Sequence, residues 1–213
     1  MNNFLRYCFF ILIVRPILIL LLGFNVRHRH RLPTHGPAII VANHNSHLDT
    51  MVLITLFPLA ILKKVRPVAA ADYFLTKKWL AWFSEKIIGI LPIKRNRIEK
   101  HENIFANIQQ CLNKKNIIIY FPEGSRGEPE QMSELKKGIA HLAKDNPTTP
   151  IYPIFMRGLG KALPKNEALL VPFVVDVIVG EPLYFKDESK HQFMTDLSHC
   201  FSELKKELII PEW

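Results

Sequence analysis

The sequence has few cysteines, no internal repeats and no low-complexity segment. Its three cysteines, Cys8, Cys111 and Cys200, are far apart and form no C-x-x-C pair. This argues against a disulfide framework or a cysteine zinc site, and it fits a reducing compartment. The features of a secretory signal peptide are also missing. Arg6 is the only basic residue before the apolar core, that core is interrupted, and no A-x-A site follows it.

Acidic residues are outnumbered. The chain has 213 residues, with 28 Lys and Arg against 19 Asp and Glu, which gives a formal net charge of +9. Such a surface attracts nucleic acid, phospholipid headgroups or phosphorylated substrates. Mean hydropathy is +0.08, which is high for so basic a chain. This combination favours an anionic membrane surface, and no basic-aromatic platform points to a nucleic-acid partner.

The N-terminus is the most apolar part of the chain. The runs Cys8–Val14 and Ile17–Phe24 are separated by Arg15 and Pro16, and the basic stretch Arg27–Arg31 follows. A spanning helix needs about 20 apolar residues. We interpret residues 1–24 as a membrane anchor that either spans the bilayer or lies in its interface. We favour a monotopic helix, because Arg15 can reach the interface more easily there. A buried core helix is the alternative.

Basic residues directly after an apolar segment are typical of the cytoplasmic side of a membrane. We therefore divide the chain into residues 1–30, the anchor with its basic juxtamembrane stretch, and residues 31–213, the main domain. That domain is expected on the cytoplasmic face of the inner membrane. Trp79, Trp82 and Phe83 could add to the membrane-facing surface or belong to the core.

The rest of the chain alternates apolar strand-like runs with helix-like segments. Runs rich in Val and Ile predict strands that are buried on both faces. The alternation predicts an α/β fold with a mostly parallel central sheet flanked by helices. The expected strands are 38–42, 67–71, 90–93, 117–121, 151–156 and 171–179, and the expected helices are 48–55, 76–86, 97–112, 136–144 and 192–206.

One candidate site follows the first of these strands. His44 comes after the run Ala38–Ala42, and Asp49 follows five positions later. A histidine held by a carboxylate is a general base near neutral pH. Alternatively, Asp49 only caps a helix and His44 only satisfies the local backbone. The two interpretations have equal weight on these residues alone.

Two further strands end in polar residues. Phe121 to Gly127 follows the run Asn116–Tyr120, and within it Gly124 lets the backbone approach a ligand while Arg126 can bind a phosphate. Alone, this segment fits an ordinary glycine turn with a surface ion pair better than a ligand site. Another strand ends in Lys94 and Arg95, and Lys136-Lys137-Gly138 opens a helix that favours anions. Since the carboxyl ends of parallel strands share one edge, these groups together suggest a phosphorylated acceptor whose hydroxyl is deprotonated.

Here the sequence resembles the glycerolipid acyltransferases of the lysophosphatidic acid acyltransferase type. Asn43-His44 with Asp49 is similar to the family's H-x4-D block, and residues 91–95 to its second block. Residues 121–126 resemble the third block, F-P-E-G-[ST]-R, and residues 149–154 the fourth. Two departures are visible: Lys94 stands where the family often has Asp, and Tyr152 where a smaller residue is common.

The resemblance implies transfer of an acyl group from acyl-CoA or acyl carrier protein to the sn-2 hydroxyl of 1-acyl-glycerol-3-phosphate, which gives phosphatidic acid for phospholipid biosynthesis. His44 would be the general base, with Asp49 orienting it. The acceptor and its phosphate would be bound by Arg95, Glu123, Gly124, Arg126, Lys94 and Lys137. Asn43 and Ser125 would support the turns, and no cofactor or metal would be needed. His47 is treated as a neighbour of the site.

Two other functions stay open. The same chemistry could act on another lysolipid, in phospholipid remodelling or on a lyso-ornithine lipid. The second is a membrane-tethered metal-binding protein, because His28, His30, His35, His44 and His47 are close in sequence. The ligand spacing typical of a metal site is absent, however, and arginines flank His28 and His30.

Overall fold

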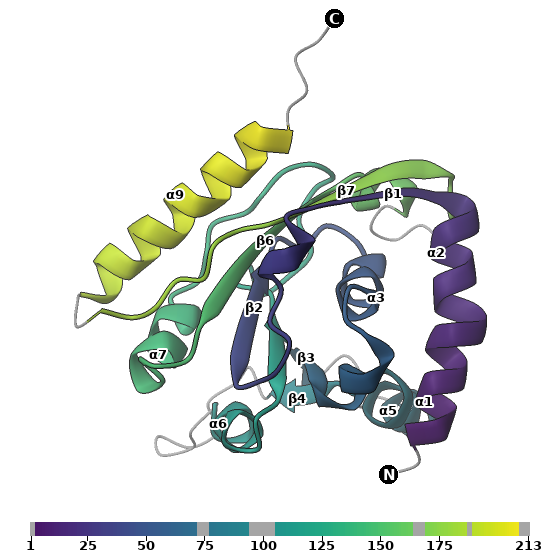
Figure 1. Ribbon diagram of the computed structural model, residues 1–213, viewed down its shortest axis with the longest axis horizontal. Helices are drawn as coiled ribbons and strands as arrows, with labels where there is room; N and C mark the ends of the chain where they lie inside the picture. Colours follow the sequence, from purple (N-terminus) through teal and green to yellow (C-terminus); the bar gives the residue numbers. More distant parts are fainter. Residues whose placement is uncertain (1–2, 72–76, 94–104, 164–168, 187–188, 209–213) are drawn as a thin grey trace, which may run out of the picture.

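The computed structural model describes residues 3–71, 77–93, 105–163, 169–186 and 189–208. A seven-stranded sheet with the order β1-β7-β6-β2-β5-β3-β4 runs through the molecule (Figure 1). All neighbouring strands pair in parallel except β6 and β7, which are antiparallel. The strands are β1 (Leu22–Arg27), β2 (Ala38–Ala42), β3 (Val65–Ala70), β4 (Leu91–Ile93), β5 (Ile117–Tyr120), β6 (Ile151–Arg157) and β7 (Phe173–Val179).

Helices cover both faces of this sheet, so the predicted α/β fold is confirmed. One face packs against the N-terminal helix and α3, and the other against α6, α7 and α9 (Figure 1). The helices are α1 (Asn3–Phe9), α2 (Arg15–Leu21), α3 (Leu48–Thr55), α5 (Lys78–Phe83), α6 (Ala106–Asn113), α7 (Gly138–Asp145), α8 (Leu159–Ala162) and α9 (Lys190–Leu208), and shorter turns lie at η1 (Phe10–Val14), η2 (Arg29–Arg31), η3 (Leu59–Lys64) and η4 (Ser84–Ile88).

The strand β2 shows why its sequence is continuously apolar. Ile40 and Ala42 point into the core on the α3 side, while Ile39 and Val41 point into the core on the α7 side. All four side chains are fully buried. Because successive side chains alternate between faces, a strand covered on both sides cannot place a polar residue on either. The polar residues therefore begin only where the strand ends, at Asn43.

The N-terminal helix continues through the predicted interruption. The segments α1, η1 and α2 form one helical stretch, Asn3–Leu21, with a mean hydropathy of 2.2, which is long and apolar enough to cross a membrane by length and composition. The π-helical turn η1 precedes Pro16, which has no N–H to donate to a carbonyl one turn back. The wider turn accommodates this proline without breaking the helix.

This helix has two distinct sides. Side chains at intervals of four point to the core, and the other side exposes large apolar residues. The helix thus packs on the domain along one side only. Only 22% of its most apolar 18-residue segment is buried. The buried side consists of Arg6, Phe10, Val14 and Leu18, and the exposed side of Phe4, Leu5, Ile11, Leu12, Ile13, Ile17, Ile19, Leu20 and Leu21.

The segment after this helix differs from the expectation. Residues 22–24 were assigned to the anchor, but Leu22–Arg27 forms β1, which pairs in parallel with β7 at the edge of the sheet. The pairing gives the backbone of β7 a hydrogen-bonding partner that a helix could not supply. Trp79 and Trp82 on α5 are 65% and 52% exposed, whereas Phe83 packs edge-on against Phe9.

A buried arginine holds the N-terminal helix against the domain. Arg6 is 1% exposed, and its Nη2 donates a hydrogen bond to the carbonyl of Val65 at 2.9 Å. Its guanidinium occupies the space beside Gly89, where a Cβ would lie 2.5 Å from Nη1. Gly89 also has φ +83°, in the left-handed region, at the end of η4. Glycine is therefore required at position 89, both because a Cβ would collide with Arg6 and because the backbone has a positive φ.

We predict that Gly89→Ala lowers the free energy of unfolding by about 1–3 kcal/mol, because it adds strain at positive φ and displaces Arg6. Gly23→Ala is the matched control. Its Cβ would meet Val174 at an ordinary 3.4 Å, so a change within about 0.5 kcal/mol is expected. Urea unfolding in detergent measures both. Equal small effects of the two variants would contradict this account of Arg6 and Gly89.

Candidate active site

The candidate site lies at the carboxyl ends of β2 and β5. These two strands are neighbours in the sheet and run in parallel. His44 follows the end of β2 by two residues, and Glu123 follows the end of β5 by three. The two polar turns therefore meet at one edge, the position where open α/β sheets bind ligands.

His44 and Asp49 form the pair that the sequence suggested. His44 Nδ1 lies 2.8 Å from Asp49 Oδ2, and the two side chains are 19% and 1% exposed. Asp49 stands in the first turn of α3, and the same Oδ2 accepts the backbone N–H groups of Asn45 at 2.7 Å and Ser46 at 2.9 Å. The carboxylate thus serves the local backbone and the histidine at once.

This arrangement determines the chemistry available to the imidazole. A carboxylate next to Nδ1 favours the tautomer that carries its proton there, which leaves the lone pair on Nε2. Asp49 also stabilises the imidazolium that forms once Nε2 takes a proton. The ring of His44 stacks on Phe121, with centroids 4.1 Å apart and planes at 19°. Its orientation is therefore constrained from both the β2 and the β5 sides.

Glu123 fixes the backbone of His44. It is 2% exposed, its Oε1 accepts the backbone N–H of His44 at 2.7 Å, and its Oε2 accepts that of Ser133 at 2.7 Å. Burial raises the pKa of this carboxyl, and the two backbone bonds partly offset that rise. Gly127 N–H in turn donates to the His44 carbonyl at 2.9 Å. These contacts give Glu123 a positioning role that the sequence did not reveal.

Asn43 links the same turn to β6. Its Nδ2 donates to the carbonyl of Met156 at 2.9 Å, and its Oδ1 accepts the Met156 N–H at 2.7 Å. Nδ2 also donates to Asn45 Oδ1 at 2.9 Å, and Asn45 Nδ2 donates to the carbonyls of Glu128 and Gln131. Because Asn43 is 2% exposed, losing these bonds would leave buried polar groups unpaired. Asn43 thus connects the turn after β2 to β6.

The residues proposed for phosphate lie around the β5 turn. Gly124 has φ +73°, and a Cβ there would lie 2.8 Å from Lys136 Nζ, so this lysine folds over the turn. Arg126 is half-buried, while Ser125 and Lys137 are exposed. Lys94 and Arg95, also predicted to bind the acceptor, lie outside the described residues. Lys136 was noted in the sequence only as part of a helix start.

His47 has a closer relation to this site than its neighbouring position suggested. Arg126 Nη1 donates a hydrogen bond to His47 Nε2, which requires an unprotonated nitrogen at that position. Partial burial, the Arg126 guanidinium and His44 lower the pKa of His47, while Asp49 partly offsets this. The neutral ring can therefore orient Arg126. Its sequence position, three residues after His44, carried no such signal.

The H-x4-D spacing by itself does not make this site. The same spacing occurs again at His191 and Asp196, both on α9. There Asp196 Oδ1 accepts a hydrogen bond from Gln192 Nε2 at 2.9 Å, and His191 is exposed. Positions five apart on a helix lie about 140° apart around its axis, so they point away from each other. The strand end and turn at 43–49 bring the first pair together instead.

All three cysteines are free. Within the described ranges, no group of three His, Cys, Asp or Glu is placed to hold a metal ion.

Comparison with known proteins identifies the family. The Acyltransferase family model matches residues 23–157, more than half of the chain. The chain therefore belongs to the Acyltransferase family, and the matched range contains the whole His44, Asp49, Glu123 and Arg126 cluster. The family resemblance drawn from the sequence blocks is thus confirmed.

Several relatives of this chain share one name among themselves, 1-acyl-sn-glycerol-3-phosphate acyltransferase. A chloroplastic 1-acyl-sn-glycerol-3-phosphate acyltransferase of Arabidopsis thaliana is 26% identical over 75% of this chain and 43% of its own length. The alpha form of this enzyme from Mus musculus is 28% identical over 67% of this chain and 48% of its own. A probable 1-acyl-sn-glycerol-3-phosphate acyltransferase of Mycoplasma genitalium is 32% identical over 59% of this chain and 46% of its own length. The chain spans less than half the length of these relatives.

A solved structure shares the fold. The crystal structure of the 1-acyl-sn-glycerophosphate acyltransferase PlsC from Thermotoga maritima superposes with a TM-score of 0.75 at 18% identity. The match covers 94% of this chain and 78% of the other. The similarity therefore includes the N-terminal helix and the sheet together.

We predict that Glu123→Gln lowers kcat about tenfold or more and leaves KM for the acceptor nearly unchanged. The amide oxygen can accept only one of the two backbone N–H groups, and an NH₂ faces the other. An unpaired buried group costs about 1–3 kcal/mol, here at the backbone that positions His44. Steady-state kinetics measure both constants. A raised KM with normal kcat would instead assign Glu123 to acceptor binding.

Proposed function

We propose that this chain transfers an acyl group from a thioester donor to the sn-2 hydroxyl of 1-acyl-glycerol-3-phosphate, which yields phosphatidic acid. The observation that carries this proposal is the His44–Asp49 pair at the same sheet edge as the Gly124–Arg126 turn. A general base and a cationic turn on adjacent strands suit an acceptor that has both a hydroxyl and a phosphate. Membership of the Acyltransferase family and the names of the relatives support the same reaction.

In the proposed reaction the acceptor oxygen is itself the nucleophile. It forms a bond to the thioester carbonyl carbon as His44 Nε2 takes its proton, and Asp49 stabilises the resulting imidazolium. The carbon–sulfur bond then breaks, and the imidazolium returns a proton to the leaving thiolate. The products are an ester and a free thiol, so no acyl-enzyme is required. Since a thioester is already activated, positioning and general base catalysis are sufficient.

The acceptor phosphate is assigned to the β5 turn. Arg126 can bind two phosphate oxygens at once, and Gly124, which has no side chain and a positive φ, would let the phosphate approach the backbone of the turn. Lys136, which folds over Gly124, adds a second cation at this point. Lys94, Arg95 and Lys137 remain proposed phosphate ligands, and Ser125 a supporting residue. Acyl-CoA or acyl carrier protein would supply the acyl group, without a further cofactor or metal.

The N-terminal helix would attach the enzyme to the membrane that contains its acceptor. The side that packs on the domain includes the buried Arg6, and the other side exposes Leu12, Ile19 and Leu20 at 69%, 72% and 80%. A helix fixed along a domain in this way fits an interfacial position better than a span, because its apolar side can insert while the domain stays in water. Trp79 and Trp82 extend this surface. We place the domain on the cytoplasmic face.

We predict that His44→Ala and Asp49→Asn each lower transfer to 1-acyl-glycerol-3-phosphate by about 10²–10⁴-fold, the usual contribution of a general base. His191→Ala and Asp196→Asn are matched controls, since they alter the second H-x4-D pair on α9 and should leave transfer unchanged. Circular dichroism verifies that all four variants fold. Near-full transfer by His44→Ala would refute the proposed base.

A panel of lysolipid acceptors tested with acyl-CoA and with acyl carrier protein checks the substrates themselves. We expect 1-acyl-glycerol-3-phosphate to be preferred. A preference for a lysophospholipid with a larger headgroup, or for a lyso-ornithine lipid, would keep the chemistry and replace the acceptor.

For the phosphate site, we predict that Arg126→Ala raises KM for the phosphorylated acceptor about 10- to 100-fold, because a hydrogen bond to a charged group contributes about 1.5–3 kcal/mol. Transfer to a monoacylglycerol, which lacks the phosphate, should change little. Initial rates over a range of each acceptor measure this difference. An equal loss with both acceptors would indicate that Arg126 stabilises the turn instead.

A further inference from the structure

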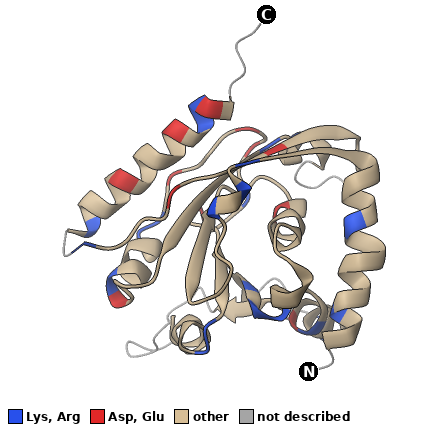
Figure 2. Ribbon diagram, viewed as in Figure 1, with Lys and Arg blue, Asp and Glu red and all other residues tan. Residues whose placement is uncertain are grey.

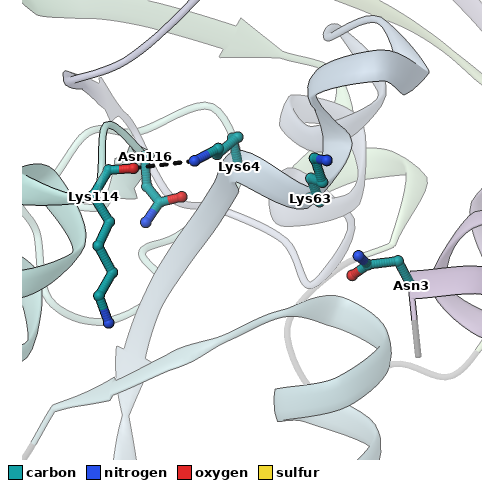
Figure 3. Close-up of a pocket in the computed structure, with 5 residues that line it drawn as sticks. All are labelled: Asn3, Lys63, Lys64, Lys114 and Asn116. Carbon is teal, nitrogen blue, oxygen red and sulfur yellow. Dashed lines mark hydrogen bonds between the residues drawn. The ribbon is translucent and has the colours of Figure 1, made fainter. Parts of the chain in front are cut away.

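A pocket separate from the candidate active site lies at the amino ends of the strands, on the opposite side of the sheet from His44. It is lined by Asn3, Lys63, Lys64, Lys114 and Asn116, and Figure 3 shows these side chains around it. Lys63 and Lys64 end the turn before β3, while Lys114 and Asn116 precede β5. The pocket thus lies at the amino ends of strands whose carboxyl ends point toward His44. Strand β5 alone, at four residues, separates the two edges by about 13 Å.

Positive charge dominates this pocket. Of the five described residues that line it, three are lysines and none is a carboxylate. Lys64 Nζ donates to the carbonyl of Lys114 at 3.1 Å, which brings these two residues together across the pocket. Between residues that the structure describes, none of these lysines forms an ion pair. A counter-charge from outside the chain would therefore relieve their mutual repulsion.

Two more cations lie behind the lysines. Arg6 donates Nη2 to the carbonyl of Val65, the residue next to Lys64, and its Nε and Nη1 are buried without a hydrogen-bond partner in the described structure. Arg66 lies close enough to repel Arg6 electrostatically. Figure 2 shows Lys and Arg, with an acidic residue among them, near the amino end of the N-terminal helix. The electrostatic potential there is thus raised by five positive side chains.

The pocket borders the apolar surface of the N-terminal helix. Asn3 lines the pocket and begins α1, and the next residues, Phe4 and Leu5, are 68% and 43% exposed. Figure 1 shows this end of α1 beside α5, which carries the exposed Trp79 and Trp82. Cations at the rim of an apolar, membrane-inserting surface lie at the depth of lipid headgroups.

We propose that the pocket formed by Lys63, Lys64 and Lys114 binds the phosphate of anionic phospholipid headgroups and fixes how the domain sits on the membrane. This proposal rests on the proposed membrane function. An acidic carrier protein is the other partner with suitable charge. The pocket borders the exposed apolar residues Phe4 and Leu5, however, and an apolar surface beside cations fits a lipid headgroup better than a soluble acidic protein.

The test compares two triple variants of the full-length protein in a vesicle cosedimentation assay. Lys63→Gln/Lys64→Gln/Lys114→Gln removes the pocket charges. Lys144→Gln/Lys186→Gln/Lys205→Gln removes the same charge from exposed positions on or next to α7 and α9, away from the N-terminal helix. Vesicles of phosphatidylcholine alone and of phosphatidylcholine with phosphatidylglycerol are used, each at low and high salt.

We expect the pocket variant to bind the phosphatidylglycerol vesicles at least about tenfold more weakly than the control variant, since each lysine near an anionic surface strengthens binding several-fold. Binding to pure phosphatidylcholine should be alike for the two variants, because the apolar surface is unchanged. The difference should shrink at high salt. Transfer to detergent-dispersed lysolipid should persist in both variants, so a failure of the proposed reaction would be seen separately, in the unmodified protein.

Equal binding of the two variants to phosphatidylglycerol vesicles would overturn the proposal. So would unchanged vesicle binding combined with a raised KM for acyl carrier protein in the pocket variant alone, which would identify a protein partner instead.

Discussion

The parallel pairing of β2 with β5 is the constraint on which the site depends. It brings the turn at 43–49 and the turn at 121–127 to one edge of the sheet, although they are far apart in sequence. Glu123 then joins them, because its buried carboxylate accepts the N–H of His44 and that of Ser133. Without this pairing, the His44–Asp49 pair would be an isolated turn, with no cationic segment beside it.

Two buried carboxylates position His44 through different groups. Asp49 acts on the imidazole through Nδ1, and Glu123 acts on the backbone through the amide. Phe121 restricts the ring from its flat side. A general base, the role proposed for His44, needs a defined orientation as well as a suitable proton affinity, and these three contacts supply the orientation. Each of the two carboxylates also holds backbone N–H groups: Asp49 accepts those of Asn45 and Ser46, and Glu123 accepts that of Ser133.

The N-terminal helix packs on the domain with one side and exposes large apolar residues on the other. Its buried side reaches from Arg6 to Leu18, and Leu22 at the start of β1 continues the same cluster, so the helix and the sheet share one core. Sequence hydropathy showed the apolar character but could not divide it between core and exterior, because lipid and protein interior favour the same side chains. The edge strand β1 was missed for this reason. The first residues of β1 are apolar and directly follow the apolar helix, so in the sequence they read as part of the same segment.

The sequence by itself determined the strand and helix alternation, and with it the α/β fold, because a strand buried on both faces must be continuously apolar. It also determined the order of the family blocks. Only the tertiary structure decided which polar residues meet. The spacing H-x4-D occurs twice, and the pair on α9 points apart while the pair after β2 meets at 2.8 Å. Likewise, the contact of Glu123 with His44 spans 79 positions, and such contacts follow from strand order, which local spacing does not encode.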